Sequence, residues 1–245
     1  MKQLKRLRVP DTHRDHSKAF IDLLIEASRH DGHHRPSHTL TTFLDMSFRA
    51  VRGQLYHPDT PAWRENEDRF ENTASRLPER ALLTEIFAKM LGHMQLAMHA
   101  APNDFIGPIF SEIATSAELG QFFTPPEVSE LIARVSLADM PAKIADPNRK
   151  GPITLLEPTC GVGGMILAAT NVMREMDVDI ANDIQWSAVE LDYRAMCAAY
   201  LQCAAAGIPA FVYWGNSLTL EISCVSPTPA ALLQRRRPAL AIAAE

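Results

Sequence analysis

The first half of the chain carries hydrophobic residues at the three- and four-residue spacing of amphipathic helices. The spacing is clearest in two stretches, residues 20–27 and residues 79–98. Side chains at this spacing share one face of a helix, and that face packs against a core. Pro78 precedes the second stretch and Pro102 follows it, as is typical of helix boundaries. The pattern predicts helices packed on one another from about residue 16 to residue 113.

The second half of the chain changes to short apolar runs, each followed by a stretch with helical spacing. The runs predict buried strands at residues 154–156, 187–189 and 211–213. Residues 165–173 and the alanine-rich residues 192–206 are expected to form the helices between them. Strands that alternate with helices are typical of a parallel, doubly wound sheet.

Composition agrees with a globular protein in two parts. Of the 245 residues, 47% are hydrophobic and 22% are charged, which is a balance that allows a packed core. We expect a helical N-terminal region at residues 1–115 and an α/β domain at residues 116–225. An Ala/Pro/Arg-rich tail occupies residues 226–245.

The charge of the chain argues against tight, autonomous binding to duplex DNA. The formal net charge is −5 at pH 7, whereas proteins that grip duplex DNA alone usually present a strongly basic surface. The run Arg235–Arg237 is a local basic strip that either contacts phosphate or forms a solvated face.

Cysteine, hydrophobic and histidine patterns exclude several other classes. The four cysteines lack CxxC spacing, which predicts reduced thiols and a cytoplasmic location. No run approaches the roughly 20 apolar residues of a membrane span, so no membrane is expected. The histidine-rich stretch 30–38 fits no zinc pattern, and we expect a solvated loop without a metal.

The strongest local signal is a glycine-rich loop that follows an apolar run. Residues 155–164 read LLEPTCGVGG. Glycines allow backbone to approach a ligand closely, and ligands of open α/β sheets bind at the carboxyl ends of the strands. Glu157 at the edge of this loop would repel a pyrophosphate but attract the cationic amino group of S-adenosylmethionine. The loop also lacks the GxGxxG pattern, which disfavours an NAD-linked oxidoreductase.

A second acidic residue follows the next expected strand. Glu190 comes directly after residues 187–189, and a carboxylate at this position can accept both hydroxyl groups of a ribose. Asp192 is the competing candidate for that role. An acidic residue ahead of a helix also interacts favourably with the helix dipole, so the assignment depends on the glycine loop upstream.

Four elements in order give the chain a family resemblance. They are GQFFTPP at residues 120–126, EPTCGVGG at 157–164, VELD at 189–192 and WGNSL at 214–218. Together they resemble the adenine-N6 DNA methyltransferases, in particular the modification subunits of type I restriction-modification systems. The resemblance implies a Rossmann-like α/β methyltransferase sheet after the helical region. It also implies that S-adenosylmethionine is the cofactor, and that DNA is the partner, bound alone or with a partner subunit. The fourth strand is expected to be completing where the sequence ends, so the sheet is expected to be incomplete.

The resemblance also implies roles for individual residues. Contacts to the methionine moiety would come from Gln121, Phe122, Thr124 and Pro125. Thr159, Gly161 and Gly163 would shape the loop beneath the cofactor, whose amino group Glu157 would attract. Glu190 would hold the ribose and Asn216 would face the adenine ring. The alternative for Phe122 and Phe123 is packing in the core.

One element of the family pattern is missing from the sequence. Members of the family hold the flipped adenine with an Asn/Asp-Pro-Pro-aromatic segment, and the only Pro-Pro here, Pro125-Pro126, is followed by Glu127. Three explanations remain open: a truncated enzyme, a divergent family member whose missing parts come from another chain, or a protein that binds S-adenosylmethionine without transferring methyl groups. They leave two hypotheses for the function. The first is a methyltransferase that transfers the methyl group of S-adenosylmethionine to adenine N6 in DNA by direct attack, with no covalent enzyme intermediate. The second is a catalytically silent module of this family that binds S-adenosylmethionine or a partner.

Overall fold

The computed structural model describes residues 13–113 and 124–234, and it divides the chain into two compact units. Among the described residues, the first unit contains residues 13–101 and 105–113, and the second contains residues 102–104 and 124–234. Each unit has its own core, and the candidate site lies in the second.

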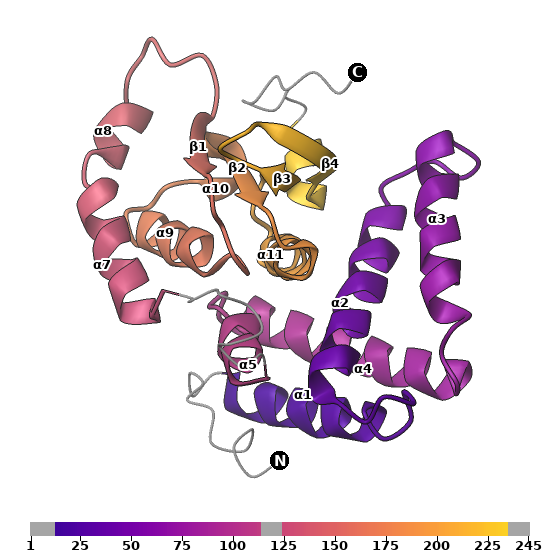
Figure 1. Ribbon diagram of the computed structural model, residues 1–245. Helices are drawn as coiled ribbons and strands as arrows, with labels where there is room; N and C mark the ends of the chain where they lie inside the picture. The colour runs from indigo at the N-terminus through magenta and orange to yellow at the C-terminus, as the bar shows by residue number, and fades with distance from the viewer. Residues whose placement is uncertain (1–12, 114–123, 235–245) are drawn as a thin grey trace. The chain divides into compact units, whose positions relative to one another are not determined.

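Five helices build the described part of the first unit. They are α1 (Arg14–Ala27), α2 (Pro36–Gly53), α3 (Pro61–Ala74), α4 (Arg80–Ala100) and α5 (Ile106–Ile113). Helix α1 lies along α4, and α2 pairs with α3 (Figure 1). The helical spacing of the first half of the sequence therefore corresponds to helices in the structure.

Phenylalanine side chains form the centre of the first unit. Phe20 on α1 has no exposed surface and meets Phe43 of α2 and Phe105 edge to face, with ring centroids 5.2 and 5.3 Å apart. Phe43 also contacts Phe87 of α4 at 5.9 Å. Edge-to-face pairs add about 0.5–1.5 kcal/mol each to the free energy of apolar burial. This cluster ties three of the helices together.

The second unit is an α/β unit around a four-stranded sheet. Its strands are β1 (Ile153–Glu157), β2 (Ile184–Glu190), β3 (Ala210–Asn216) and β4 (Glu221–Pro227). Its helices are α7 (Pro126–Ser136), α8 (Met140–Ile144), α9 (Gly164–Glu175), α10 (Ile180–Asp183), α11 (Tyr193–Ala205) and α12 (Pro229–Leu233). The expected class is confirmed, because a mixed α/β fold with a small sheet follows a set of helices.

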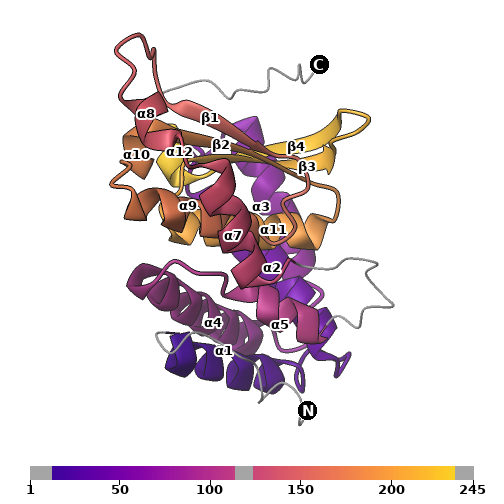
Figure 2. The same cartoon turned by 90° about the vertical axis from the view of Figure 1, so that its left-hand side faces the viewer.

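The strands lie in the order β1-β2-β3-β4, with β1, β2 and β3 parallel and β4 antiparallel to β3. The order of the parallel strands runs in one direction, so right-handed crossovers bring α9 and α11 to the same face, as Figure 2 shows. Within the described residues the sheet is thus mixed, and its crossover helices are not divided between two faces. The second strand is buried along its whole length, because it lies between β1 and β3.

The family resemblance implied a fourth strand near the end of the sequence, but no local pattern predicted the position of β4. Its first four residues alternate between exposed and partly buried, Ser226 is buried, and among the described strands β4 pairs only with β3. The register shifts at a bulge between Trp214 and Gly215, and a Cβ at Gly215 would clash with the carbonyl oxygen of Glu221. Glycine is therefore required at the bulge.

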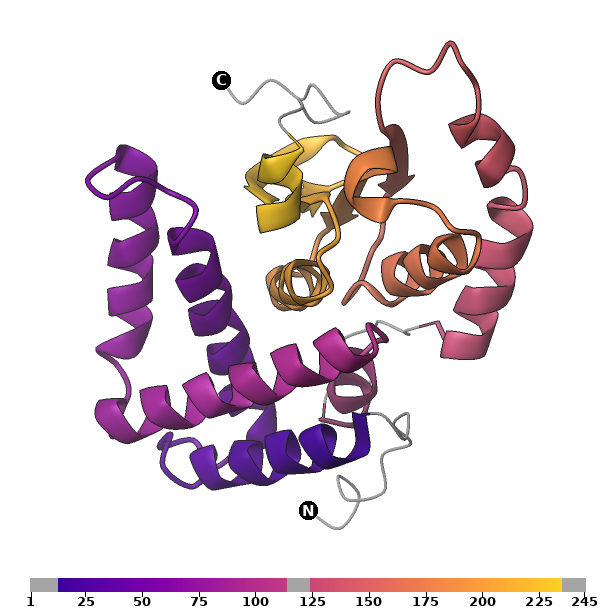
Figure 3. The same cartoon turned by 180° about the vertical axis from the view of Figure 1, so that it is seen from behind.

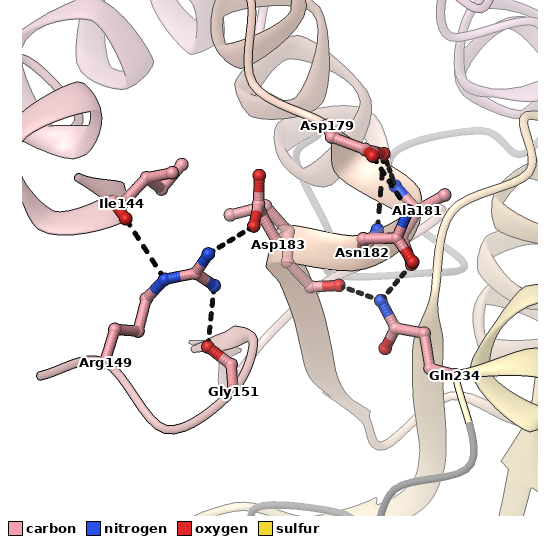
Figure 4. Close-up of polar contacts among 9 residues, drawn as sticks. Ile144, Arg149, Gly151, Asp179, Ala181, Asn182, Asp183 and Gln234 are labelled. Atoms are coloured by element: carbon pink, nitrogen blue, oxygen red, sulfur yellow. Dashed lines mark hydrogen bonds and ion pairs between the residues drawn. The ribbon is translucent and has the colours of Figure 1, made fainter. Parts of the chain in front are cut away.

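Two polar side chains, Arg149 and Gln234, form hydrogen bonds at the edge of the sheet where the parallel strands begin. Arg149 binds Asp183 at 2.6 Å and also donates to the carbonyl oxygens of Ile144 and Gly151 (Figure 4). Gln234, which follows α12, donates to the carbonyl oxygens of Ala181 and Ile184. Figure 3 shows the yellow α12 beside the orange α10 at this end of the sheet. The opposite end, where the parallel strands stop, carries the candidate site.

Candidate functional site

The candidate site lies at the carboxyl ends of β1 and β2. Glu157 is the last residue of β1 and Glu190 is the last residue of β2, and the two strands are parallel neighbours. The glycine loop, residues 158–163, connects β1 to α9. The structure therefore brings the predicted loop and both predicted carboxylates to one edge of the sheet, where open α/β folds bind ligands.

Two glycines give the loop its shape. Gly161 has φ +55° and Gly163 has φ +97°, which are backbone conformations that side chains disfavour. A Cβ at Gly163 would lie 3.3 Å from Cα of Ala199 on α11. Gly163 is therefore needed both for the turn and for the close contact between the loop and α11.

Glu190 joins the loop to the end of β2. Its side chain is 6% exposed. One carboxylate oxygen accepts a hydrogen bond from the backbone nitrogen of Gly161, and the other accepts one from that of Asp192, both at 2.8 Å. The backbone nitrogen of Cys160 donates to the carbonyl oxygen of Val189 at 2.9 Å. These bonds hold the first half of the loop against β2.

Asp192 caps a helix, whereas Glu190 bonds to the glycine loop. Its carboxylate accepts from the backbone nitrogens of Arg194 and Ala195, which makes it the N-cap of α11. It also pairs with the guanidinium of Arg194 at 2.6 Å. Burial would raise the pKa of Asp192, but the bonds from Arg194 outweigh burial and the pKa lies below its ordinary value. Asp192 is thus engaged in capping, while Glu190 lies against the loop.

The site has an acidic character. Glu157 is half-buried and its Oε1 accepts from the backbone nitrogen of Thr159, which is exposed. Burial, reinforced by the carboxylates of Glu190 and Glu157, raises the pKa of the Cys160 thiol well above its ordinary value. The thiol therefore stays neutral, and the two glutamates dominate the charge around the loop. Such a site favours a cation over a phosphate.

The end of β3 lies next to the end of β2. The indole nitrogen of Trp214 donates to the carbonyl oxygen of Leu191 at 3.1 Å, and the Trp214 ring contacts that of Tyr193. Asn216, the last residue of β3, accepts through Oδ1 from the backbone nitrogens of Leu218 and Thr219. The side-chain oxygen of Asn216 therefore stabilises the turn that follows β3.

The upstream element is only partly described. Gln121 and Phe122 lie outside the described residues, as do Phe123 and the basic run Arg235–Arg237. Thr124 and Pro125 are exposed, and the carbonyl oxygen of Pro125 accepts from the backbone nitrogens at the start of α7. Helix α7 packs against α9, the helix that the glycine loop enters.

Sequence reasoning missed two polar residues beside the loop, Gln202 and Asp104. Gln202 on α11 donates to the carbonyl oxygen of Val162 at 2.8 Å and to Asp104 at 2.9 Å. After Arg194, Gln202 is the one amide among the apolar and alanine residues and tyrosine of α11, and this is the signal that could have identified it. Asp104 lies 98 positions away in the sequence, and no local pattern connects the two.

Within residues 13–113 and 124–234, no three or more His, Cys, Asp or Glu side chains are grouped so that they could bind a metal ion. In the histidine-rich stretch, Asp31 instead accepts from the backbone nitrogens of His33 and His34 and from the Thr39 hydroxyl. None of the helices in the same ranges combines the length and hydropathy needed to cross a membrane.

Comparison with known proteins gives a family match and several solved structures of similar fold, of which two are described. A methyltransferase subunit of a type I restriction-modification system from Streptococcus thermophilus is 12% identical, with a TM-score of 0.43. The alignment covers 85% of this chain and 59% of that one, so the chain spans less than two thirds of that subunit. A putative class I S-adenosylmethionine-dependent methyltransferase from Listeria monocytogenes is 10% identical, with a TM-score of 0.40 and coverage of 90% and 69%.

The chain matches none of the curated proteins with which it was compared. Residues 109–223 match the model of the N-6 DNA Methylase family. This range contains the glycine loop, Glu157, Glu190 and the whole of strands β1, β2 and β3. The predicted resemblance to the N-6 DNA methylases is therefore confirmed for this part of the chain.

Proposed function

We propose that the second unit binds S-adenosylmethionine at the carboxyl ends of β1 and β2, as the cofactor half of a DNA adenine-N6 methyltransferase. The observation that carries the proposal is the position of Glu190. Its carboxylate lies at the end of β2 and bonds to the backbone of the glycine loop, 29 residues earlier. A nucleoside that contacts both the loop and this carboxylate would bind in the usual place for an open α/β sheet.

The charges and donors of the site fit the cofactor. Its ammonium and sulfonium groups are positive, and Glu157 and Glu190 supply negative charge at the loop. Glu190 uses each oxygen for one backbone bond, and each retains a lone pair for a ribose hydroxyl. The Oδ1 of Asn216 already accepts from the turn, so an adenine contact would use its amide nitrogen. When bound, S-adenosylmethionine supplies an electrophilic methyl group.

The upstream residues of the proposed site complete the methionine end. Gln121 and Phe122 are assigned to this end by resemblance alone, together with the exposed Thr124 and Pro125. Thr159 is exposed next to Glu157, and its hydroxyl would donate a hydrogen bond to the carboxylate of the methionine moiety. Gly161 is partly exposed and has no side chain to cover the backbone of the loop, whereas Gly163 is buried against α11.

Residues that would hold the target adenine are not identified in the second unit as described. The prolines after β3 do not supply the missing segment. The hydroxyl of Thr228, between Pro227 and Pro229, is buried: it donates to the carbonyl oxygen of Ile208 and accepts from the nitrogen of Ala210. This segment joins β4 to α12. We propose that DNA is the substrate, bound by this chain alone or together with a partner subunit.

A second function competes with methyl transfer, because the family's Asn/Asp-Pro-Pro-aromatic segment is missing. The amino group of adenine is a weak nucleophile, and oxygens that accept its hydrogens help to activate it. A chain without them would be a silent module that binds S-adenosylmethionine or a partner. Transfer of labelled methyl groups to unmethylated DNA, with analysis for N6-methyladenine, separates the two functions.

Calorimetric titration with S-adenosylmethionine tests the binding site itself. We expect saturable binding by the wild-type chain, and Glu190→Ala should weaken it at least about tenfold, or about 1.4 kcal/mol. Glu175→Ala is the control, because Glu175 ends α9 in an exposed pair with Arg134. It should leave the affinity unchanged. A folded wild-type chain that binds no S-adenosylmethionine contradicts the proposal.

Gly161→Ala and Gly207→Ala form a second matched pair. Both glycines have left-handed φ values, +55° and +65°, so alanine strains the backbone similarly at each. Gly207 lies in the turn after α11, and a Cβ there would meet no atom within 4 Å. We expect only Gly161→Ala to weaken binding of S-adenosylmethionine. Equal affinities for the two variants would argue against a ligand at the loop.

A further inference from the structure

Gln202 is a fully buried amide that contacts the glycine loop from behind. It lies on α11 and has no exposed surface. Its Nε2 donates one hydrogen bond to the carbonyl oxygen of Val162 at 2.8 Å and one to Oδ1 of Asp104 at 2.9 Å. Burying an amide is costly unless it is hydrogen-bonded. A leucine or methionine would fill the same space without that cost, so packing alone does not require glutamine here.

Asp104 is fixed in turn by the segment that carries it. Residues 102–104 pack with the second unit. The side-chain amide of Asn171 on α9 donates to the carbonyl oxygen of Pro102 and to Oδ1 of Asn103, both at 3.0 Å. The other oxygen of Asp104 would lie 3.0 Å from a Cβ at Gly164, the first residue of α9. The carboxylate is therefore held close to the junction of the loop and α9.

Two side chains thus hold the loop on either side of Val162. Glu190 accepts from the nitrogen of Gly161, before Val162, and Gln202 donates to the carbonyl oxygen of Val162 itself. The next residue, Gly163, has φ +97°. The bond from Gln202 fixes the peptide plane between Val162 and Gly163, which glycine would otherwise leave free to rotate.

We propose that Gln202, oriented by Asp104, is a positioning residue that keeps the glycine loop in the conformation that receives S-adenosylmethionine. The inference rests on the proposed function, because it concerns the same loop. A loop that is already ordered binds its ligand more tightly, since less conformational entropy is lost on binding. Gln202 acts through Val162, on the side of the loop that α11 covers, and has no assigned contact with the cofactor.

Three variants separate positioning from simple stability. Gln202→Met keeps the approximate volume but removes both donors. Asp104→Leu removes the acceptor that orients Gln202, whereas Asp104→Asn retains a carbonyl oxygen that can accept. The control is Asn171→Leu, which releases the same segment, residues 102–104, without touching the loop. Each variant is measured in the full chain for thermal stability, affinity for S-adenosylmethionine and hydrogen exchange of the loop amides.

Loop exchange provides a readout that does not depend on the cofactor. The amides of Gly161 and Gly163 are both hydrogen-bonded, to Glu190 and to the carbonyl oxygen of Cys160. We expect Gln202→Met and Asp104→Leu to speed their exchange and to lower the affinity for S-adenosylmethionine about tenfold. Asp104→Asn should restore both properties. Asn171→Leu should lower the melting temperature while leaving loop exchange and affinity near wild-type values.

The outcomes distinguish this inference from the proposed function. If Gln202→Met and Asp104→Leu change stability alone, as Asn171→Leu does, Gln202 is a structural residue and the inference is wrong. If the wild-type chain binds no S-adenosylmethionine, the proposed function is wrong, and faster loop exchange in the two variants then shows only that Gln202 orders the loop. Should Gln202→Met fail to fold, Asp104→Leu and its Asp104→Asn counterpart decide the question.

Discussion

Glu190 accepts a hydrogen bond from the backbone nitrogen of Gly161 at 2.8 Å, and this bond connects the end of β2 to the loop after β1. The second oxygen of Glu190 accepts from the nitrogen of Asp192 at the same distance. One buried carboxylate therefore organises both connections at this edge of the sheet. The arrangement makes Glu190 part of the local structure before any ligand binds.

The Glu190→Gln variant should reveal this structural role. Glutamine keeps the shape but has one acceptor oxygen, so its amide hydrogens would face one of the two backbone donors. We expect the free energy of unfolding to fall by about 1–3 kcal/mol, as for a buried donor left without a partner. Urea denaturation checks the value. Glu221→Gln is the control, because the carboxylate of Glu221 is exposed and accepts a hydrogen bond from the Thr219 hydroxyl at the surface. Equal losses for both variants would contradict the prediction.

Alanine at Gly163 should be less well tolerated than alanine at Gly207. Both positions have positive φ, which costs a side chain about 1–2 kcal/mol. Only at Gly163 does the added Cβ also meet backbone, at 3.3 Å from Cα of Ala199. We expect Gly163→Ala to lose about 1–3 kcal/mol more than Gly207→Ala because of this overpacking. Thermal unfolding of the two variants measures the difference. Similar melting temperatures would contradict the prediction, because they would mean that α11 shifts to accommodate the added methyl group.

Cys224 should react with iodoacetamide before the three buried cysteines. Burial raises the pKa of Cys203 to about 12, and burial with the nearby Glu190 raises that of Cys160. The thiolate is the reactive form, so both thiols should be inert in the folded chain at pH 8. Cys224 is half-buried and should react first. Peptide mass spectrometry identifies the modified residue, and a denatured sample in which all four react is the control.

Asp31 should stabilise the first unit at neutral pH and lose that effect in acid. Burial would raise the pKa of Asp31, but hydrogen bonds from Thr39, His33 and His34 outweigh it and hold the pKa below its ordinary value. A carboxylate with a lowered folded pKa stabilises the protein above its unfolded pKa, about 3.9. The contribution is lost as the pH falls through the folded pKa.

Thermal unfolding of Asp31→Asn between pH 7 and pH 3 tests this linkage. At pH 7 the variant should melt below the wild type, because asparagine cannot accept the same three bonds. The gap should narrow below about pH 4, first because Asp31 binds a proton in the unfolded chain and then, at lower pH, because the folded carboxylate does. A gap that stays constant over this range would mean that the charge of Asp31 contributes nothing to stability.

The sequence predicts the glycine loop and its neighbours well because their signals are local. Apolar runs indicated β1 and β3, and the alanine-rich stretch indicated α11. The second strand begins earlier than expected, at Ile184 rather than residue 187, because Gln185 is polar but buried. Strand β4 has too little hydrophobic alternation to be recognised, and it depends on pairing with β3.

The polar contacts that shape the site could not be predicted in the same way. The bond between Gln202 and Asp104 spans 98 positions, and that between Glu190 and Gly161 spans 29. Both depend on how the chain folds back on itself, which no periodic pattern encodes. Asp192 and Glu190 are similar as acidic residues near a strand end, and only their hydrogen bonds distinguish a helix cap from a loop anchor.

The close packing of Gly163 against Ala199 means that substitutions at these two positions depend on each other. The loop and α11 share a space that the methyl group of Ala199 already lines, 3.5 Å from where a Gly163 Cβ would stand. A larger residue at position 199 would push the loop outward even if every glycine were kept. Descendants of this sequence can therefore enlarge position 199 only if the loop also shifts. An alanine with no ligand contact would thus be as constrained in evolution as the loop glycine that it faces.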